Sequence, residues 1–347
     1  MNKSILWNKV YGSLLAGVMG DAMGAPSEGM TYQEIEKEFG YINDFSGAGT
    51  DDSAIKLILC EAILNNNGYV TADEFADAFL NNKDNYYSLF YIPVRNMFHK
   101  LESKLSLPVY AGYGNMQSSS SAMSITPMGL INACNPRQAA QETYDVAGLI
   151  HAGDSTFCRD GACAIAAAVA EALSPDATVE SIVAASYQYL HKQSSIVMIN
   201  KIKQVIALAY ETKSYEQFRE RFYQSFLQDI ISDSRETVPC TIALFVLADG
   251  DPNKAMIYAA NFGRDSDTIG TMIGGICGAF KGVDGLKKEW VQKLEATYGQ
   301  RQENSKGVDI KAAVPDHAQL ADQLVDIIQK KAEDTKACLN RIDALMQ

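Results

Sequence analysis

Apolar residues recur every three or four positions along most of the chain, which is the spacing of one face of an α-helix. Runs of β-branched residues with a period of two are scarce, and segment 107–111 is the one short candidate for a strand. The alternation of apolar and polar positions therefore predicts an all-α protein.

Residues typical of helix ends support this interpretation. The start signals are capping-box pairs and a proline at a first helical position: Thr31 with Glu34, Thr71 with Glu74, Ser214 with Gln217, and Pro252 after Asp251. The sequence Asn-Asn-Asn-Gly at 65–68 and Asp249-Gly250 predict the ends of helices that begin near Asp51 and Thr237. No long linker separates the predicted helices, so we expect one domain over residues 1–347.

Two further segments have a recognisable pattern. Segment 112–121, GYGNMQSSSS, is polar and of low complexity, which predicts a surface loop. The apolar residues of 315–347 are spaced for two amphipathic helices. We expect this tail to cover the helical core or to form a dimer contact.

Small residues recur at every fourth position in two segments: Gly12, Ala16, Gly20 and Gly24, then Gly270, Gly274, Gly278 and Gly282. Glycine inside a helix costs roughly 1 kcal/mol relative to alanine, so such a stripe indicates close packing of helices or close approach to a ligand. Asp21 and Asp265 make a membrane location costly, and no apolar run reaches about 18 residues. We expect the two central helices of a soluble bundle.

Charge and cysteine content narrow the classes of protein. The chain has 42 acidic and 30 basic residues, a net charge of −12, which argues against nucleic acid as the main partner. Its 7 cysteines include no C-x-x-C pair, so we expect them to be reduced. Asn8 and Lys9 interrupt the apolar N-terminal stretch, so it does not resemble a signal peptide, and we expect a cytoplasmic protein.

Carboxylates in glycine-rich, apolar surroundings form three clusters in the sequence. They are Asp21 followed by Glu28, segment 50–53 (TDDS), and segment 263–268 (GRDSDT). Buried carboxylates are costly without a cation or hydrogen bonds, and Mg²⁺ prefers such hard oxygen ligands. The last two clusters also fit plain helix starts, where acidic residues favour the helix dipole without any metal. The residues alone leave open whether the clusters converge.

The segments GSLLAGVMGDAMGAPSEG, TDDS, and GRDSDT followed by IGTMIGGICGAF resemble, in order and spacing, the motifs of the ADP-ribosylglycohydrolase family. The resemblance covers about residues 10–283 and leaves 284–347 as a helical extension. It implies a single-domain orthogonal multi-helix bundle with a central site for two Mg²⁺ ions, for which Mn²⁺ can substitute. The implied metal ligands are Thr50, Asp51, Asp52, Asp265, Asp267 and Thr268, with Glu28 beside the second ion.

Other positions resemble the part of the family site that holds the substrate. His151 resembles the histidine that lies against the ribose and phosphates, and segment 114–129 resembles the loop around the diphosphate. Ser124 stands where that loop often has an arginine, and Arg264 begins the third motif where glycine is commoner. The implied substrate-binding residues are Glu28, Gly114, Asn115, Ser124, His151, Gly153, Asp154 and Arg264.

The resemblance implies Mg²⁺-dependent cleavage of the N- or O-glycosidic bond at the anomeric carbon of ribose in an ADP-ribosylated small molecule or protein. The metals would bind the 2′- and 3′-hydroxyls and orient the ring for attack by water. A carboxylate must take a proton from that water, and Glu28 and Asp52 are both candidates for this catalytic role.

Three alternative functions and the oligomeric state stay open. The serine at position 124 favours a nucleoside hydrolase or another simple N-riboside hydrolase on the same scaffold. A two-metal phosphohydrolase and a non-catalytic, crystallin-like binding protein are the others, and the reaction product would distinguish them. We expect a monomer or homodimer that binds neither nucleic acid nor a membrane.

Overall fold

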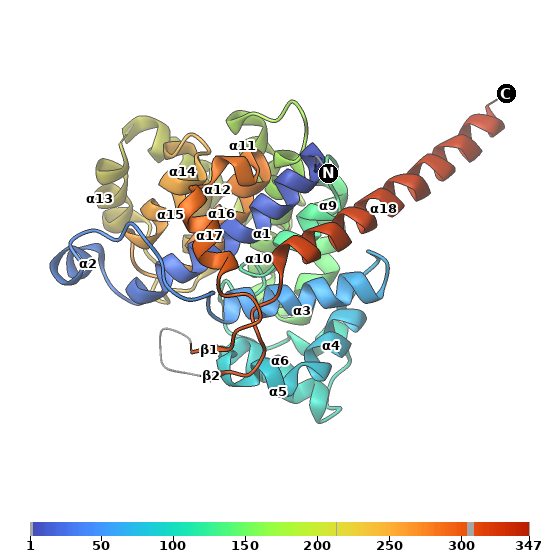
Figure 1. Cartoon of the computed structure of the whole chain (residues 1–347), viewed down its shortest axis with the longest axis horizontal. Helices are drawn as coiled ribbons and strands as arrows, with labels where there is room; N and C mark the ends of the chain where they lie inside the picture. The colour runs from blue at the N-terminus through green and yellow to red at the C-terminus, as the bar shows by residue number, and fades with distance from the viewer. Residues whose placement is uncertain (1–2, 213, 304–308, 347) are drawn as a thin grey trace.

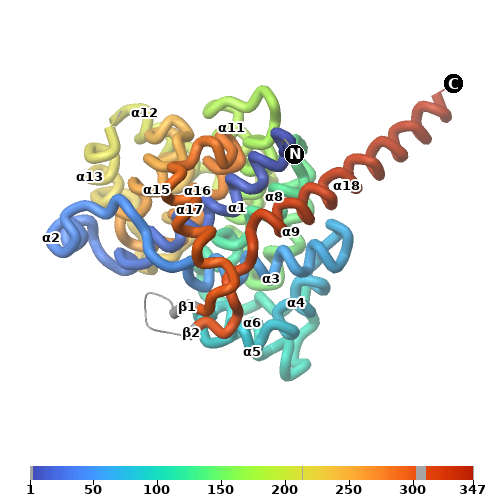
Figure 2. Tube along the Cα trace, in the orientation of Figure 1, coloured from blue at the N-terminus to red at the C-terminus, as the bar shows by residue number. Residues whose placement is uncertain are grey.

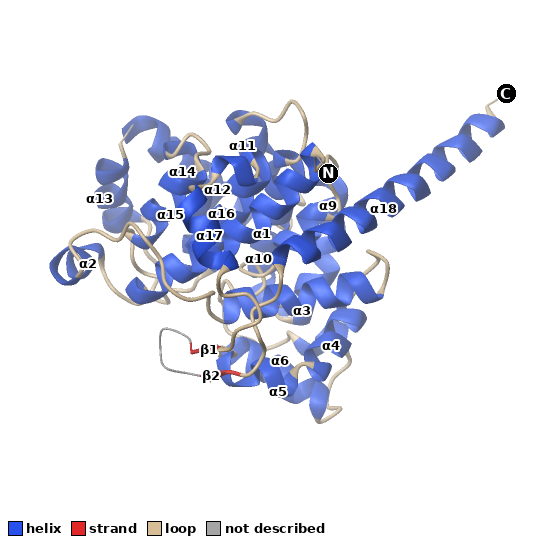
Figure 3. Ribbon diagram, viewed as in Figure 1, coloured by secondary structure: helices blue, strands red, loops and turns tan. Residues whose placement is uncertain are grey.

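The computed structural model describes residues 3–212, 214–303 and 309–346, and helices make up most of this part of the chain (Figure 1; Figure 3). The prediction of an all-α fold is confirmed. Two strands of two residues each, β1 (Gln302–Glu303) and β2 (Asp309–Ile310), pair antiparallel at one edge of the molecule.

The described residues form eighteen α-helices and five short 3₁₀-helices. The α-helices are α1 (Ile5–Gly24), α2 (Tyr32–Glu38), α3 (Asp51–Asn65), α4 (Ala72–Asn81), α5 (Lys83–Tyr86), α6 (Ile92–Glu102), α7 (Pro108–Ala111), α8 (Thr126–Leu130), α9 (Pro136–Val146), α10 (Thr156–Ala172), α11 (Val179–Gln188), α12 (Ile196–Thr212), α13 (Tyr215–Ser225), α14 (Ser234–Leu247), α15 (Pro252–Ala260), α16 (Ser266–Lys281), α17 (Lys288–Glu295) and α18 (His317–Leu345). The 3₁₀-helices are η1 (Ala25–Ser27), η2 (Tyr87–Leu89), η3 (Ala147–Leu149), η4 (Gly153–Ser155) and η5 (Val283–Gly285).

Helices α1 and α16 carry the two small-residue stripes and pack against each other in the middle of the molecule (Figure 2). A Cβ atom at Gly20 would lie 2.1 Å from the carbonyl oxygen of Gly270, and one at Gly24 would lie 2.3 Å from that of Ser266. Any side chain at these positions would force the helices apart. The stripes therefore serve helix packing, and they hold the end of α1 next to the start of α16.

The capping signals identify most helix boundaries correctly. Thr31 and Thr71 form complete capping boxes for α2 and α4, and α3 begins at Asp51 and ends at Asn65. Helix α14 begins at Ser234 rather than near Thr237, because the carboxylate of Asp233 accepts a hydrogen bond from the Arg235 amide and caps the helix there.

Three local predictions are wrong. Segment 107–111 forms helix α7 instead of a strand, because Pro108 suits a first helical position. The tail forms the single helix α18 instead of two, since no glycine or proline interrupts residues 317–345. In segment 112–121 the serines at 118–121 are buried, because the loop turns them toward the interior, where they hydrogen-bond to other groups.

Among the described helices, none combines the length and the apolar character that crossing a membrane requires. All seven cysteines are free thiols, and five of them are buried: Cys60, Cys158, Cys163, Cys240 and Cys277.

Candidate active site

Residues from all three acidic sequence clusters approach one cavity of about 360 Å³. Its lining residues are Glu28, Thr50, Asp51, Asp52, Ser88, Leu89, Phe90, Tyr91, Ile92, Arg95, Ser119, Ser120, Met123, Ile231, Ser232, Asp265, Asp267 and Thr268. The structure thus brings segments 50–52 and 265–268 together, which the sequence could not establish.

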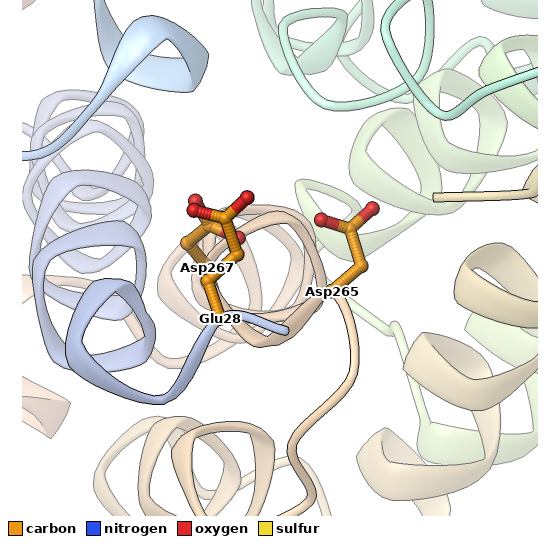
Figure 4. A group of neighbouring side chains, drawn as sticks. All are labelled: Glu28, Asp265 and Asp267. Atoms are coloured by element: carbon orange, nitrogen blue, oxygen red, sulfur yellow. The ribbon is translucent and has the colours of Figure 1, made fainter. Parts of the chain in front are cut away.

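The end of α1 places Glu28 beside the start of α16. The peptide N–H of Gly29 donates to the carbonyl of Arg264, and that of Arg264 donates to the carbonyl of Met30, each at 2.7 Å. Carboxylate oxygens of Glu28, Asp265 and Asp267 come within 4.8 Å of one another. Figure 4 shows the three carboxyl groups pointing to the same side, above the start of α16.

The start of α3 is fixed by Asp21 of α1. The buried Asp21 carboxylate accepts hydrogen bonds from the peptide N–H groups of Thr50 and Ser53 at 3.0 Å, and from the Ser53 hydroxyl. It therefore acts as an anion at the N-terminus of α3, where free peptide N–H groups favour negative charge. Burial nevertheless raises the pKa of Asp21. Through Asp21 and Glu28, helix α1 positions all three acidic segments.

The acidic wall of the cavity, which we define as Glu28 with segments 50–52 and 265–268, concentrates like charges in a desolvated place. Burial and then the charge of Asp267 raise the pKa of Asp52 well above its usual value. Burial, and to a smaller extent the charge of Glu28, also raises the pKa of Asp267 well above its usual value. Burial raises the pKa of Asp265 to about 7. The buried Lys56 interacts electrostatically with Asp52 and Asp21 and offsets part of this negative charge.

A neutral group of residues lies next to the acidic wall. We define it as the serine wall, formed by residues 118–121 and His151, of which Ser119 and Ser120 line the cavity. The Ser119 hydroxyl donates to Asp265 at 2.7 Å and links the two walls. The His151 ring nitrogens lie 3.1 Å from the Ser118 hydroxyl and 2.9 Å from the Ser121 hydroxyl. Because the ring is completely buried, its pKa falls to about 3, so His151 is neutral.

Comparison with known proteins agrees with this arrangement. The family model for ADP-ribosylglycohydrolases matches residues 2–334. The chain belongs to the ADP-ribosylglycohydrolase family. The resemblance carried by the three sequence motifs is thereby confirmed.

Two relatives are similar to this chain over most of their length, and a third is similar over a short stretch. YegU of Escherichia coli (strain K12) is 26% identical over 316 residues, which cover 83% of this chain and 92% of YegU. A protein of Archaeoglobus fulgidus is 24% identical over 307 residues, with the same coverage of 83% and 92%. The human ADP-ribosylhydrolase ARH3 is 36% identical over only 70 residues, 17% of this chain and 19% of ARH3.

A solved structure of an ADP-ribosylglycohydrolase-related protein complex has the same fold. It superimposes with a TM-score of 0.65 at 18% identity, and the match covers 93% of this chain and 98% of that chain.

Most of the substrate-binding residues implied by the resemblance lie outside the cavity lining. The side-chain amide of Asn115 donates to the carbonyls of Pro93 and Ile150, so it fastens the loop in place. Ser124 is buried, and Asp154 is exposed. Of the residues with this implied role, the lining includes Glu28 and excludes Gly114, Asn115, Ser124, His151, Gly153, Asp154 and Arg264.

Arg264, which the resemblance places among the substrate-binding residues, forms an ion pair and is not among the described residues that line the cavity. Its guanidinium donates to the Glu236 carboxylate at 2.8 and 3.0 Å and to the carbonyl of Gln228 at 2.6 Å. Glu236 is completely buried, so this ion pair neutralises an otherwise unpaired interior charge. The partner Glu236 lies on α14.

Two groups of this site were not predicted from the sequence, and a third, Asp21, was predicted only as a member of an acidic cluster. Arg95 of α6 is the one basic side chain among the described residues that line the cavity, and its guanidinium donates to the carbonyl of Ser88 at 3.0 Å. Ser119 contacts Asp265, and Asp21 supports α3. The Gly20-Asp21 pair carried a usable signal, because an acidic residue within a small-residue stripe must find a buried partner. Nothing in the pattern around Arg95 indicated its position.

Proposed function

We propose that this protein is a divalent-metal-dependent hydrolase that cleaves the N- or O-glycosidic bond at the anomeric carbon of ribose in an ADP-ribosylated substrate. Membership of the ADP-ribosylglycohydrolase family supports glycosyl hydrolase chemistry in general. The single observation that carries the finer proposal is the convergence of five carboxylates on one cavity: Glu28, Asp51, Asp52, Asp265 and Asp267. The local similarity to the human ADP-ribosylhydrolase agrees with it.

The donor set of the acidic wall fits magnesium. The Oδ2 atom of Asp52 is buried and has no hydrogen-bond partner among the described residues, so it retains a free acceptor. The lining contains carboxylate and hydroxyl oxygens and no His or Cys, which matches Mg²⁺ or Mn²⁺ better than zinc. We propose that Thr50, Asp51, Asp52, Asp265, Asp267 and Thr268 hold two Mg²⁺ ions, with Glu28 beside the second. Bound cations would offset the carboxylate charges and fix the vicinal hydroxyls of the ribose.

The protein's own groups supply the remaining chemistry. Cleavage at the anomeric carbon passes through a transition state with positive charge on the sugar ring, which the anionic wall stabilises. A carboxylate that is ionised when the site is loaded takes a proton from the attacking water. We propose Glu28 and Asp52 as the two candidates, since both line the cavity. Ser119 holds Asp265 in place.

Arg95 supports an ADP-ribosyl substrate over a simple riboside. Its guanidinium can bind a phosphate through charge-assisted hydrogen bonds. Arg95 would then make the phosphate contact that the resemblance implied for position 124 or for Arg264. The simple N-riboside hydrolase remains the second candidate, because no other basic side chain of the described residues lines the cavity. Recognition of the diphosphate therefore depends on one residue.

A product screen tests the proposal. Purified protein is incubated with N- and O-linked ADP-ribosyl peptides, small ADP-ribose conjugates and nucleosides, in Mg²⁺, in Mn²⁺ or in chelator. We expect free ADP-ribose from a conjugate with either metal and none in chelator. Release of phosphate would indicate a phosphohydrolase, release of ribose from nucleosides alone would favour the second candidate, and no turnover of any compound would favour a binding protein.

A further inference from the structure

Helix α18 leaves the body of the protein about halfway along its length and extends away from it (Figure 1; Figure 2). Its buried residues all lie in the first half, from His317 to Lys331. The last contacts with the body are those of Lys331 with Glu142 and of Asp334 with the Tyr69 hydroxyl. Residues 332–346 are all exposed.

The projecting half carries a continuous apolar stripe. Four of its side chains are large, apolar and exposed: Leu339 by 54%, Ile342 by 46%, Leu345 by 87% and Met346 by 73%. The stripe has the alternating spacing of three and four that defines a coiled-coil seam and runs through Val325, Ile328, Ala332, Thr335, Leu339, Ile342 and Met346. Val325 and Ile328 are buried against the body, whereas the later members have no partner within the described chain.

A helix end of this length does not stabilise itself. Isolated helices shorter than about 12 to 15 residues are marginal in water, and most helical stability in proteins comes from packing of an apolar face. Contiguous exposed apolar residues rimmed by polar ones mark an interaction site. The projecting half of α18 therefore needs a partner along its seam.

The charges beside the seam identify that partner. Lys336 and Asp343 occupy the same flanking position in successive heptads, and the ion pairs that α18 forms among the described residues are those of Asp322 and Lys331. In an antiparallel pair of identical helices, Lys336 faces Asp343 of the partner subunit, and the same contact occurs twice. A parallel pair would instead place Lys336 near the partner's Lys331, which is already bonded to Glu142 in its own subunit, so Lys336 would gain no ion pair. We propose that a second copy of this chain packs antiparallel along residues 335–346 of α18 and forms a two-fold symmetric dimer.

The register follows from the seam. Leu339 packs against Ile342 of the partner subunit, and Thr335 packs against the partner's Met346. The tip of the partner helix then lies within a turn of Asp334 and its bonded Tyr69, whose ring is 51% exposed. The interface is at the small end for a stable dimer, so we expect a micromolar dissociation constant.

Charge reversal tests both the partner and the orientation. The full-length protein is measured by sedimentation equilibrium over about 1 to 100 µM, the range expected for an interface of this size. We expect dimerisation to weaken about tenfold in Lys336→Glu and in Asp343→Lys, because each change creates two like-charge contacts. The double variant Lys336→Glu/Asp343→Lys restores both contacts and should dimerise like the unmodified protein.

A second pair of variants tests the seam. Leu339→Glu/Ile342→Glu should abolish the dimer, whereas Asn340→Glu/Ala344→Glu adds the same charge to the opposite face and should leave it intact. Far-UV spectra and turnover establish that each variant is folded. A monomeric unmodified protein at about 100 µM, or equal effects of the two double-glutamate variants, would overturn the proposal. Failure of the double charge reversal to restore association would overturn the antiparallel arrangement.

Discussion

The acidic wall and the serine wall border the same cavity but satisfy their buried polar groups in opposite ways. In the acidic wall, burial and neighbouring charges raise the pKa values of Asp52, Asp265 and Asp267, and an oxygen of Asp52 has no hydrogen-bond partner among the described residues. In the serine wall, neutral hydroxyls and the His151 ring hydrogen-bond one another. The first wall needs a proton or a cation, and the second is complete without either.

This difference separates groups that react from groups that position. A buried charge without a partner is costly, so it is retained where a ligand compensates it. A satisfied neutral network makes the surrounding structure rigid and fixes its members in place. We therefore propose that the acidic wall holds the metals and the reacting water, while His151 positions Ser119 and its neighbours through the loop.

The largest expected effect comes from neutralising one member of the acidic wall. Asp267→Asn keeps the side-chain size but removes a negative charge and a metal ligand. We expect kcat/KM with Mg²⁺ to fall about 10³-fold. In metal-free buffer the midpoint of thermal unfolding should rise by about 2 °C, because a buried like-charge contact is lost. Steady-state kinetics and thermal melting, with and without chelator, measure both effects.

An exposed aspartate provides the matched control. Asp326→Asn on α18 makes the same chemical change outside the cavity and should alter neither turnover nor melting. Full activity of Asp267→Asn, or of the unmodified protein in chelator, would contradict the proposed role of the acidic wall.

The next effect concerns Arg95, the basic side chain that lines the cavity. A charge-assisted contact to phosphate contributes about 1.5 to 3 kcal/mol, so Arg95→Ala should lower kcat/KM for an ADP-ribosyl conjugate about 10 to 150-fold. The corresponding value for a simple riboside should stay unchanged, because that substrate has no phosphate. Arg95→Lys should recover part of the loss. Equal losses for both substrates would show that Arg95 supports the fold rather than the phosphate.

The acidic wall was largely predictable from the sequence. Helix starts such as 50–52 and 265–268 have local signals, because capping residues and acidic first turns depend only on neighbours in the chain. The small-residue stripes also indicated that α1 and α16 approach each other closely, and this contact is what brings Glu28 to Asp265.

The serine wall was not predictable, because its character depends on burial. Segment 112–121 reads as a polar surface loop, yet serines 118–121 are buried by contacts from distant helices, such as the Ser234 hydroxyl bonded to the Ser118 carbonyl. His151 is completely buried and neutral, and the sequence does not indicate its hydrogen bonds to Ser118 and Ser121. Arg264 paired with Glu236, a residue 28 positions away in the sequence that no local pattern connects to it.

Replacing His151 in the serine wall should lower stability more than activity, the reverse of the result expected for Asp267→Asn. His151→Phe fills about the same space but removes one hydrogen bond from each of the Ser118 and Ser121 hydroxyls, which keep Ser120 and the Cys158 carbonyl as partners. We expect the free energy of unfolding to fall by about 1 to 3 kcal/mol and kcat/KM to fall less than about 10-fold. Denaturant unfolding and kinetics measure the two effects.

The exposed His191 offers the control for that substitution, since His191→Phe should leave both quantities near those of the unmodified protein. A loss of activity above about 100-fold in His151→Phe, with stability retained, would indicate instead that His151 contacts the substrate.

The smallest expected effect is a dependence of folding stability on pH, which has opposite signs for the two walls. Burial raises the pKa of Asp265 from 3.8 to about 7, so its contribution to stability is fully present below about pH 4 and is lost as the pH rises through about 7. Burial lowers the pKa of His151 from 6.5 to about 3, so its contribution is full above pH 6.5 and is lost as the pH falls through about 3. The metal-free protein should therefore lose stability toward both ends of this range.

Divalent cations should remove the loss of stability at the upper end of this pH range. Because a metal ion replaces the proton on the acidic wall, saturating Mg²⁺ stabilises the folded state more as the carboxylates ionise. In chelator, we expect the free energy of unfolding to decline from about pH 4 to 7 with a slope of at most about 1.4 kcal/mol per pH unit for one group. Asp265→Asn should make this decline shallower by the contribution of one group, and the part that remains comes from Asp52 and Asp267. An unchanged slope in that variant would show that Asp265 does not carry the proton, and that the two walls differ less than their hydrogen bonding indicates.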